Sequence, residues 1–195
     1  MRQIVCYFDV ASPLAWLAFE QLPDALVGVS HWVDYRPVLR DRLRARHAGI
    51  ARNPTATTVQ EDVARAREIA AAADIAFSPP ETPFDPRRLL HLLLARALPG
   101  TGPNRYVVER VMRHVWQADG TDPSTPERLS ALGAALAPRC PVDSTDVAAE
   151  LNAMSDAAAA RRIADVPAFE VPSLQLRLEG YGGLAELTKA LGPGA

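Results

Sequence analysis

The residues best placed for chemistry are Ser12 and Pro13, which follow a short apolar run and open a segment with helical spacing. Serine is favoured at the N-cap of a helix and proline at its first position, so the pair predicts a sharp strand-to-helix turn. The first N–H groups of such a helix point outward together, and its dipole places partial positive charge there. We therefore expect an anion to bind beside Ser12.

A thiolate is the anion best suited to this position, because a helix N-terminus lowers the pKa of a thiol and so stabilises its charged form. The chain has no cysteine there: Ser12-Pro13-Leu14-Ala15 stands where redox-active thioredoxin-like enzymes carry Cys-Pro-x-Cys. Exchange of protein disulfides is therefore excluded unless a thiol arrives from outside. Ser12 is expected to donate a hydrogen bond to such an exogenous thiolate.

Other reactive side chains show no pattern that indicates a site. Cys6 and Cys140 lie far apart and form no Cys-x-x-Cys pair, so they indicate neither a disulfide framework nor a zinc site. The histidines lack the spacing of metal ligands, and glycine-rich phosphate loops are absent. The 21 basic residues are balanced by 23 acidic ones, so we expect no metal and no nucleic-acid partner.

The elements that must position Ser12 follow an α/β order. An apolar run over residues 3–10, rich in β-branched and aromatic side chains, predicts a buried strand, and the spacing of Leu14, Leu17 and Leu22 predicts a helix after Pro13. A second apolar run over residues 31–39 predicts a strand beside the first. Together they form a βαβ unit with a parallel strand pair and a right-handed crossover.

Helical patterns dominate the middle of the chain. They predict helices over residues 59–73, 86–98, 105–117, 126–136 and 144–164. The proline-dense segment 78–86 predicts a rigid connection suited to the wall of a cavity. An alternating strand over residues 173–178 and a helix over 184–191 end the pattern.

Length and composition favour one globular domain. The chain has 195 residues, 48% hydrophobic and 23% charged, with a formal net charge of −2. We expect a sheet part over about residues 1–56 and 160–195 and a helical insertion over about 57–159. Neither a secretory leader pattern nor a transmembrane window is present, so we expect a cytoplasmic protein with no membrane partner.

The segment YFDVASPLAWLAFEQLP is similar to the N-terminal motif of 2-hydroxychromene-2-carboxylate isomerases and kappa-class glutathione transferases, members of the wider DsbA-like group. The resemblance continues over nearly the whole chain through YRPVL, Asn53-Pro54, FSPPETPFDPRRL, HVWQADGTD, and FEVPS followed by YGG. It implies a thioredoxin-like sheet, made of a βαβ unit, a strand pair and a terminal helix, with an inserted α-helical domain.

The resemblance also implies site residues. Ser12 would be catalytic and would orient the thiolate of glutathione. Val171-Pro172-Ser173 would be the counterpart of a cis-proline turn that faces the serine, with Val171 and Gly183 among the glutathione-binding residues. The substrate would be held by Arg44, Asn53 and Phe84, the arginine gripping a carboxylate with its guanidinium fork.

The implied reaction is cis–trans isomerisation of a small aromatic carboxylate. A glutathione thiolate adds, which converts a double bond into a single one and removes the torsional barrier, the bond rotates, and the thiolate leaves. Two alternatives stay open: a kappa-type glutathione transferase or peroxidase, and a glutathione-independent, non-catalytic binding relative. Members of the family are commonly dimers, so the resemblance also implies a possible homodimer.

Three positions depart from the family pattern. Pro167 and Glu170 stand where the family normally has glycines, and Leu184 stands where an aspartate usually grips the γ-glutamyl group of glutathione. Loss of a charge-assisted contact typically costs about 1.5–3 kcal/mol, or roughly ten- to a hundredfold in affinity. These departures motivate the glutathione-independent alternative.

Each candidate also has a purely structural interpretation. Ser12 could be only an N-cap, and Arg44 could belong to a solvated basic face. Asn53 could simply begin a turn, and Phe84 could be a core residue. Trp16, one helical turn after Ser12, fits either the core or a pocket.

Overall fold

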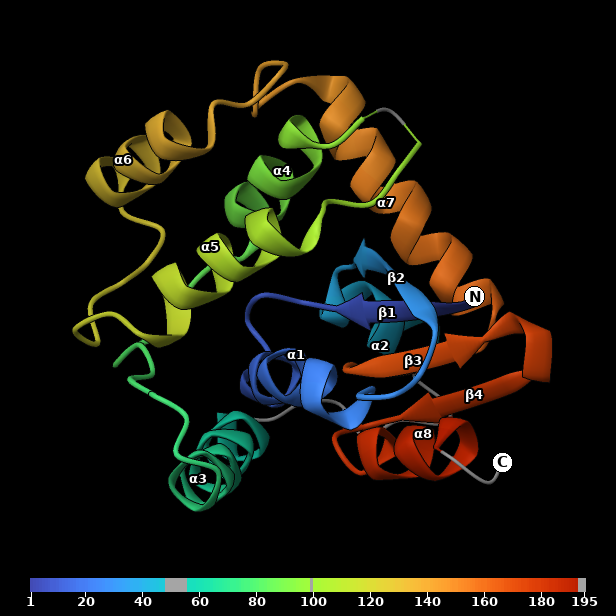
Figure 1. Cartoon of the computed structure of the whole chain (residues 1–195). Helices are drawn as coiled ribbons and strands as arrows, with labels where there is room; N and C mark the ends of the chain where they lie inside the picture. Colours follow the sequence, from blue (N-terminus) through green and yellow to red (C-terminus); the bar gives the residue numbers. More distant parts are fainter. Residues whose placement is uncertain (48–55, 99, 193–195) are drawn as a thin grey trace.

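The chain begins with the predicted βαβ unit. The structure is a computed structural model and describes residues 1–47, 56–98 and 100–192 (Figure 1). Strand β1 (Arg2–Phe8) leads through helix α1 (Pro13–Ala25) to strand β2 (His31–Pro37). The two strands pair in parallel from Arg2 opposite His31 to Phe8 opposite Pro37.

Helices separate this unit from the second half of the sheet. They are α2 (Arg40–Arg46), α3 (Ala56–Ala72), α4 (Arg87–Arg96), α5 (Arg105–Trp116), α6 (Pro126–Leu136) and α7 (Thr145–Ala160). The chain then returns as β3 (Ala168–Val171), a short 3-10 helix (Pro172–Leu174), β4 (Leu176–Glu179) and α8 (Gly183–Leu191). Helices α4, α5 and α6 lie beyond the C-terminal end of β1 (Figure 1).

The sheet has the strand order β2-β1-β3-β4. Strand β3 runs antiparallel to β1, with Tyr7 opposite Ala168, and β4 runs antiparallel to β3, with Ala168 opposite Glu179. This is a thioredoxin-like sheet with helices between its two halves, so the predicted fold class is confirmed.

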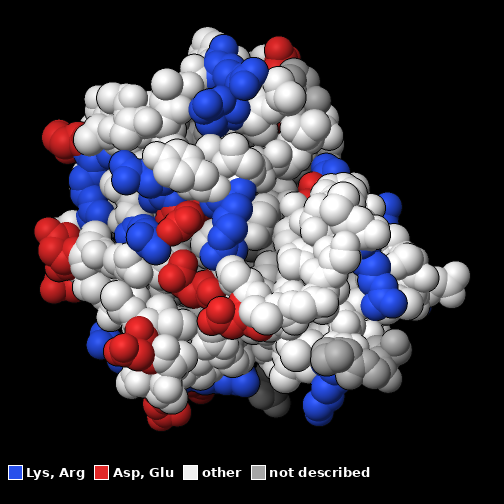
Figure 2. Space-filling model, in the orientation of Figure 1, with Lys and Arg blue, Asp and Glu red and all other residues white. Residues whose placement is uncertain are grey.

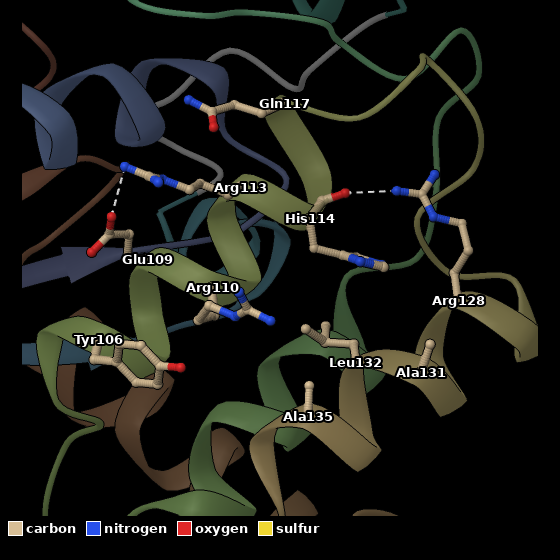
Figure 3. Close-up of a pocket in the computed structure, with 10 residues that line it drawn as sticks. All are labelled: Tyr106, Glu109, Arg110, Arg113, His114, Gln117, Arg128, Ala131, Leu132 and Ala135. Atoms are coloured by element: carbon tan, nitrogen blue, oxygen red, sulfur yellow. Dashed lines mark hydrogen bonds and ion pairs between the residues drawn. The ribbon is translucent and has the colours of Figure 1, made fainter.

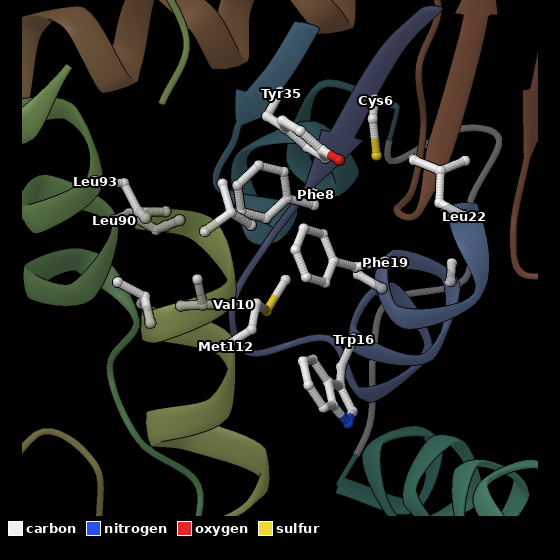
Figure 4. Close-up of a cluster of buried hydrophobic side chains, with 14 of the residues drawn as sticks. Cys6, Phe8, Val10, Trp16, Phe19, Leu22, Tyr35, Leu90, Leu93 and Met112 are labelled. Carbon is white, nitrogen blue, oxygen red and sulfur yellow. The ribbon is translucent and has the colours of Figure 1, made fainter. Parts of the chain in front are cut away.

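Successive residues of β1 face opposite sides of the sheet and enter two cores. Ile4, Cys6 and Phe8 pack in the larger core with α1, α4, α5 and α8. Figure 4 shows part of it, with aromatic rings from β1 and α1 facing leucines of α4 and Met112 of α5. Val5 and Tyr7 pack in the smaller core with residues of α2 and α7. The C-terminal end of β1 is therefore enclosed on both faces.

Two segments differ from the sequence prediction. Residues 40–46, whose arginines the sequence presents as a solvated basic face, form helix α2, because Leu43 is fully buried and the arginines pair with carboxylates elsewhere. The strand predicted over 173–178 is found only in part, because residues 173 and 174 lie in a 3-10 turn and β4 begins at Leu176. Two short strands, β3 and β4, flank a 3-10 turn, so the strand pair begins at Ala168.

The surface carries charges of both signs. On the face drawn in Figure 2, Lys and Arg side chains lie interspersed with Asp and Glu side chains. An extended basic surface of the kind that binds a nucleic-acid backbone is therefore not present on this face. Within the described residues, no helix is long and apolar enough to cross a membrane.

Candidate functional site

Ser12 lies at the start of α1, as predicted, and is its N-cap. Its backbone is extended, with φ −93° and ψ 112°, its Oγ accepts a hydrogen bond from the Ala15 N–H at 3.3 Å, and Pro13 follows at the first helical position. The residue is fully buried. Because Oγ is used as an acceptor and no described residue takes its proton, the hydroxyl can still donate one hydrogen bond.

The turn before Ser12 is held by Asp9, which sequence reasoning did not single out. The Ser12 N–H donates to the Asp9 carbonyl at 3.1 Å, and the Asp9 carboxylate accepts from the N–H groups of Ala11 at 2.9 Å and Arg40 at 2.8 Å. The side chain is buried, and burial raises the pKa of Asp9 to about 6 although these hydrogen bonds oppose the shift. Asp9 thus ties the turn to the start of α2.

Arg40 extends this link with its guanidinium. It pairs with Asp165 at 2.6 Å and with Asp62 of α3 at 2.8 Å. Arg44 reaches the same Asp165 carboxylate at 2.6 Å. Burial acts to raise the pKa of Asp165, but the hydrogen bonds and charges of the two arginines outweigh it and hold that pKa below its ordinary value. The network connects α2, α3 and the segment that enters β3.

The predicted cis-proline turn at Val171-Pro172 is wrong. The cis peptide bond found in the described residues joins Val166 and Pro167, immediately before β3. Tyr7 pairs with Ala168, so Pro167 lies beside the C-terminal end of β1, near the turn that carries Ser12. Val171 lies at the other end of β3, beyond the residue that pairs with Val5.

The error came from two Val-Pro dipeptides five residues apart. Only the strand register shows which of them meets the serine turn. The resemblance implies a Val-Pro dipeptide before the last strand pair, and the dipeptide in that position is Val166-Pro167, because β3 begins at Ala168. Val171 and Pro172 therefore do not lie beside Ser12. Pro167, which departs from the glycine of the family pattern, is explained by its place before β3.

Gly183 lies at the edge of the sheet where β1 ends and β3 begins. The Gly180 N–H donates to the Pro167 carbonyl at 2.8 Å, and Gly183 begins α8 three residues later. A Cβ added to Gly183 would lie 3.0 Å from the Leu178 Cβ, so α8 needs a glycine there to approach β4. The packing explains this glycine, and its role toward glutathione stays a prediction.

The three residues predicted to hold the substrate do not form one site in the structure described here. Arg44 is buried and bonded to Asp165, so its guanidinium has a partner within the protein. Phe84 is half-buried and packs against the larger core. Asn53 lies outside the described residues.

Glu170 does not bring a free negative charge to the serine turn. Its carboxylate accepts from Tyr7 Oη at 2.8 Å and pairs with Arg161 at 3.3 Å and Arg177 at 3.4 Å. Burial, together with this bond to Glu170, raises the pKa of Tyr7. The charge of Glu170 is therefore compensated on the sheet face that Tyr7 shares.

Two tryptophans approach the serine turn. Trp116, at the end of α5, donates its Nε1–H to the Val10 carbonyl at 3.0 Å and stacks on Phe77, with ring centroids 5.6 Å apart. Trp16 of α1 stacks on Phe19, with centroids 6.3 Å apart. Sequence reasoning left the role of Trp16 open and did not foresee the contact of Trp116.

A cavity of about 730 Å³ lies elsewhere, between α5 and α6. Tyr106, Arg110 and His114 of α5 face Leu132 of α6 there (Figure 3). Burial lowers the pKa of His114, whose ring bonds the Pro123 carbonyl at 2.9 Å. None of the predicted site residues lines this cavity, so it is separate from the serine turn.

Across residues 1–47, 56–98 and 100–192, no three His, Cys, Asp or Glu side chains gather closely enough to hold a metal ion.

Comparison with known proteins supports the fold. The sequence matches no protein-family model and no curated protein. Among solved structures it is similar to a 2-hydroxychromene-2-carboxylate isomerase, with a TM-score of 0.80, 17% identity and coverage of 96% of this chain and 93% of the other. It also resembles a probable DsbA oxidoreductase from Streptomyces coelicolor, with a TM-score of 0.70, 18% identity and coverage of 98% and 88%.

A third structure is the cytosolic disulfide reductase DsbM from Pseudomonas aeruginosa, solved with GSH. Its TM-score is 0.63 at 16% identity, with coverage of 97% of this chain and 96% of that one. At such identities the likeness shows a shared fold. The chain therefore has the DsbA-like form of the thioredoxin fold, as the sequence predicts.

Proposed function

We propose that the protein is a thiol-dependent enzyme whose site lies at the start of α1, and that it isomerises a small aromatic carboxylate with the help of glutathione. The observation that carries the proposal is the fully buried hydroxyl of Ser12, whose proton has no acceptor among the described residues. The isomerase with a TM-score of 0.80 and the disulfide reductase solved with GSH support the choice of reaction and thiol.

The surroundings of Ser12 suit a thiolate. The first turn of α1 has no acidic residue, so the partial positive charge of the helix end is not cancelled there. The nearby Asp9 carboxylate is turned toward backbone N–H groups and the start of α2. Bound glutathione would supply the thiolate that adds to the conjugated double bond and leaves after rotation.

The substrate carboxylate needs a cation or N–H donors. Arg44 was the predicted holder, and its bond to Asp165 argues for a positioning role instead. Its guanidinium helps to fix the segment before Val166, which lies beside the end of β1. Asn53 and Phe84 stay candidates for contact with the aromatic part of the substrate.

The test is a comparison of two N-caps. Ser12→Ala is expected to lower kcat/KM for isomerisation of 2-hydroxychromene-2-carboxylate at least about tenfold, because it removes a hydrogen bond to a charged sulfur. Ser144→Ala is the matched control, since Ser144 caps α7 through an Oγ contact to the Val147 N–H, also at 3.3 Å. Each change costs about 1 kcal/mol of helix capping.

An equal effect of the two substitutions on turnover would contradict the proposal. So would a wild-type rate that does not depend on added thiol. Leu184, in place of the family aspartate, is the observation that favours a glutathione-independent binding relative. Calorimetry that detects no binding of glutathione at millimolar concentration would select that alternative, and conjugation of a model electrophile without isomerisation would select a kappa-type transferase.

A further inference from the structure

The indole nitrogen of Trp16 is a buried donor without an acceptor. Trp16 is 0% exposed, and its Nε1 has no hydrogen-bond partner among the described residues. A buried indole N–H normally finds an acceptor, as that of Trp116 does at the Val10 carbonyl. An unmet donor of this kind is costly, and an acceptor atom brought by a ligand would satisfy it.

The direction of the side chain places this donor near Ser12. Trp16 follows Ser12 by four residues, so the two lie on the same face of the helix. Long side chains on a helix lean toward its N-terminus and cover the preceding turn, which here is the turn that Ser12 begins. Figure 4 shows the indole beside the N-terminal end of α1, with its nitrogen directed away from the aromatic cluster of Phe8 and Phe19.

The ring is held in this position by other aromatic side chains. It stacks on Phe19 with an angle of 21° between the rings. Phe19 in turn contacts Tyr35, at 5.6 Å between centroids, and lies under the Arg105 guanidinium at 4.2 Å. The donor is therefore fixed before any ligand arrives, and little order has to be gained on binding.

We propose that Trp16 is a binding residue of the site and donates its Nε1–H to the anionic sulfur of a thiol bound beside Ser12. The inference rests on the proposed function, namely that an exogenous thiolate binds at the start of α1. Two neutral donors, the Ser12 hydroxyl and the Trp16 indole, then meet one acceptor. Both favour the thiolate over the thiol, so together they lower the pKa of the bound thiol.

The experiment follows the three indole N–H signals of ¹⁵N-labelled protein during titration with reduced glutathione. Trp32→Phe and Trp116→Phe assign two of the signals, which leaves that of Trp16 by elimination. We expect the Trp16 indole proton to move downfield as the sulfur binds. Trp32, which is 44% exposed, is expected to stay in place.

A variant measures the size of the effect. Trp16→Phe keeps an aromatic ring against Phe19 and removes the N–H, and it should weaken glutathione binding about ten- to a hundredfold. The pKa of the bound thiol, followed by thiolate absorbance, should rise in this variant. Trp32→Phe should change neither quantity.

The outcomes separate the two proposals. If glutathione shifts the backbone N–H signals of Ser12, Leu14 and Ala15 but leaves the Trp16 indole unmoved, and Trp16→Phe binds as the wild type does, this inference is overturned and the proposed function stands. If glutathione shifts none of these signals in the wild type, both are overturned. The wild-type titration decides the matter even if Trp16→Phe does not fold.

Discussion

At Asp9 a single buried carboxylate serves two backbone segments, the serine turn and the start of α2. The hydrogen bonds to Ala11 and Arg40 favour its charged form, and its burial disfavours that form more strongly. The guanidinium of Arg40 supports the charge, and Asp41 on the same helix opposes it. Ionisation of Asp9 therefore costs free energy in the folded protein at neutral pH.

This balance predicts a pH dependence of stability. The folded pKa of Asp9, about 6, lies above its ordinary value of 3.8, so the folded state binds the proton more tightly than the unfolded state does. The stabilising contribution is complete below pH 4 and is lost as the pH rises through 6. Asp9→Asn should remove that dependence.

The measurement is urea unfolding of wild type and Asp9→Asn between pH 4 and 7. The free energy of unfolding of the wild type, relative to the variant, is expected to fall by up to about 3 kcal/mol over this range. A difference that stays constant with pH would show that Asp9 has an ordinary pKa.

Gly183 offers a second test at the scale of one residue. Gly183→Ala places a Cβ 3.0 Å from the Leu178 Cβ, and we expect a loss of about 1–3 kcal/mol because the backbone of α8 must shift. Gly182→Ala is the control, since a Cβ there meets nothing within 4 Å and the backbone is already helical. Thermal unfolding of both variants checks the difference, and equal melting temperatures would contradict the packing argument.

At the scale of the elements, α2 is held to the rest of the fold by ion pairs. Its arginines Arg40 and Arg44 converge on Asp165, and Arg42 pairs with Asp156 of α7. Most of this short helix is polar, so its hydrophobic pattern is weak and the sequence left helix and loop open as alternatives. The partners lie more than a hundred residues away, where local spacing carries no information.

The two kinds of ion pair should differ in their contribution. Arg40→Ala removes the ion-pair partner of Asp62 and leaves Asp165 with Arg44 alone, and it is expected to cost about 2–3 kcal/mol of stability. Arg42→Ala breaks a pair whose side chains are both 37% exposed, and the cost should stay within about 1 kcal/mol. Chemical denaturation of the two variants measures this, and a larger loss for Arg42→Ala would refute the ranking.

Strand β3 shows how a short element misleads sequence interpretation. It has four buried residues and no alternation, whereas the following LQLRL alternates and looks more like a strand. The long helices and β1 were predicted closely because their periodic patterns extend over ten or more residues, or over a continuous apolar run. The register that brings Pro167 to the serine turn exists only once β1 and β3 pair.

On the scale of the whole molecule, the fold and the position of Ser12 could be predicted from the sequence, whereas the network around the serine could not. Asp9, Arg40 and Asp165 come from three segments that only the tertiary structure brings together. The division into a sheet part and a helical insertion stays a prediction. The unpaired indole N–H of Trp16 likewise emerges only from the tertiary structure, since the sequence does not show which donors find acceptors.

The distribution of the two cysteines predicts the thiol chemistry of the intact protein. Cys6 is buried, and burial raises its pKa to about 12, whereas Cys140 is exposed. Iodoacetamide should therefore label one thiol in the native protein and two after unfolding, as counted by mass spectrometry. Insulin reduction should stay at background, and catalysed reduction without added thiol would contradict the absence of a redox pair.

The bond from Trp116 to the Val10 carbonyl bears on how this architecture can be modified. It joins the helical segment to the backbone two residues before Ser12. The helices therefore cannot be exchanged for others without affecting the turn that carries the serine. A graft of foreign helices would leave this carbonyl without its donor unless the graft supplied one at the same point. The outer surfaces of the helices can therefore change in sequence, whereas the indole of Trp116 has to be kept or replaced by another donor.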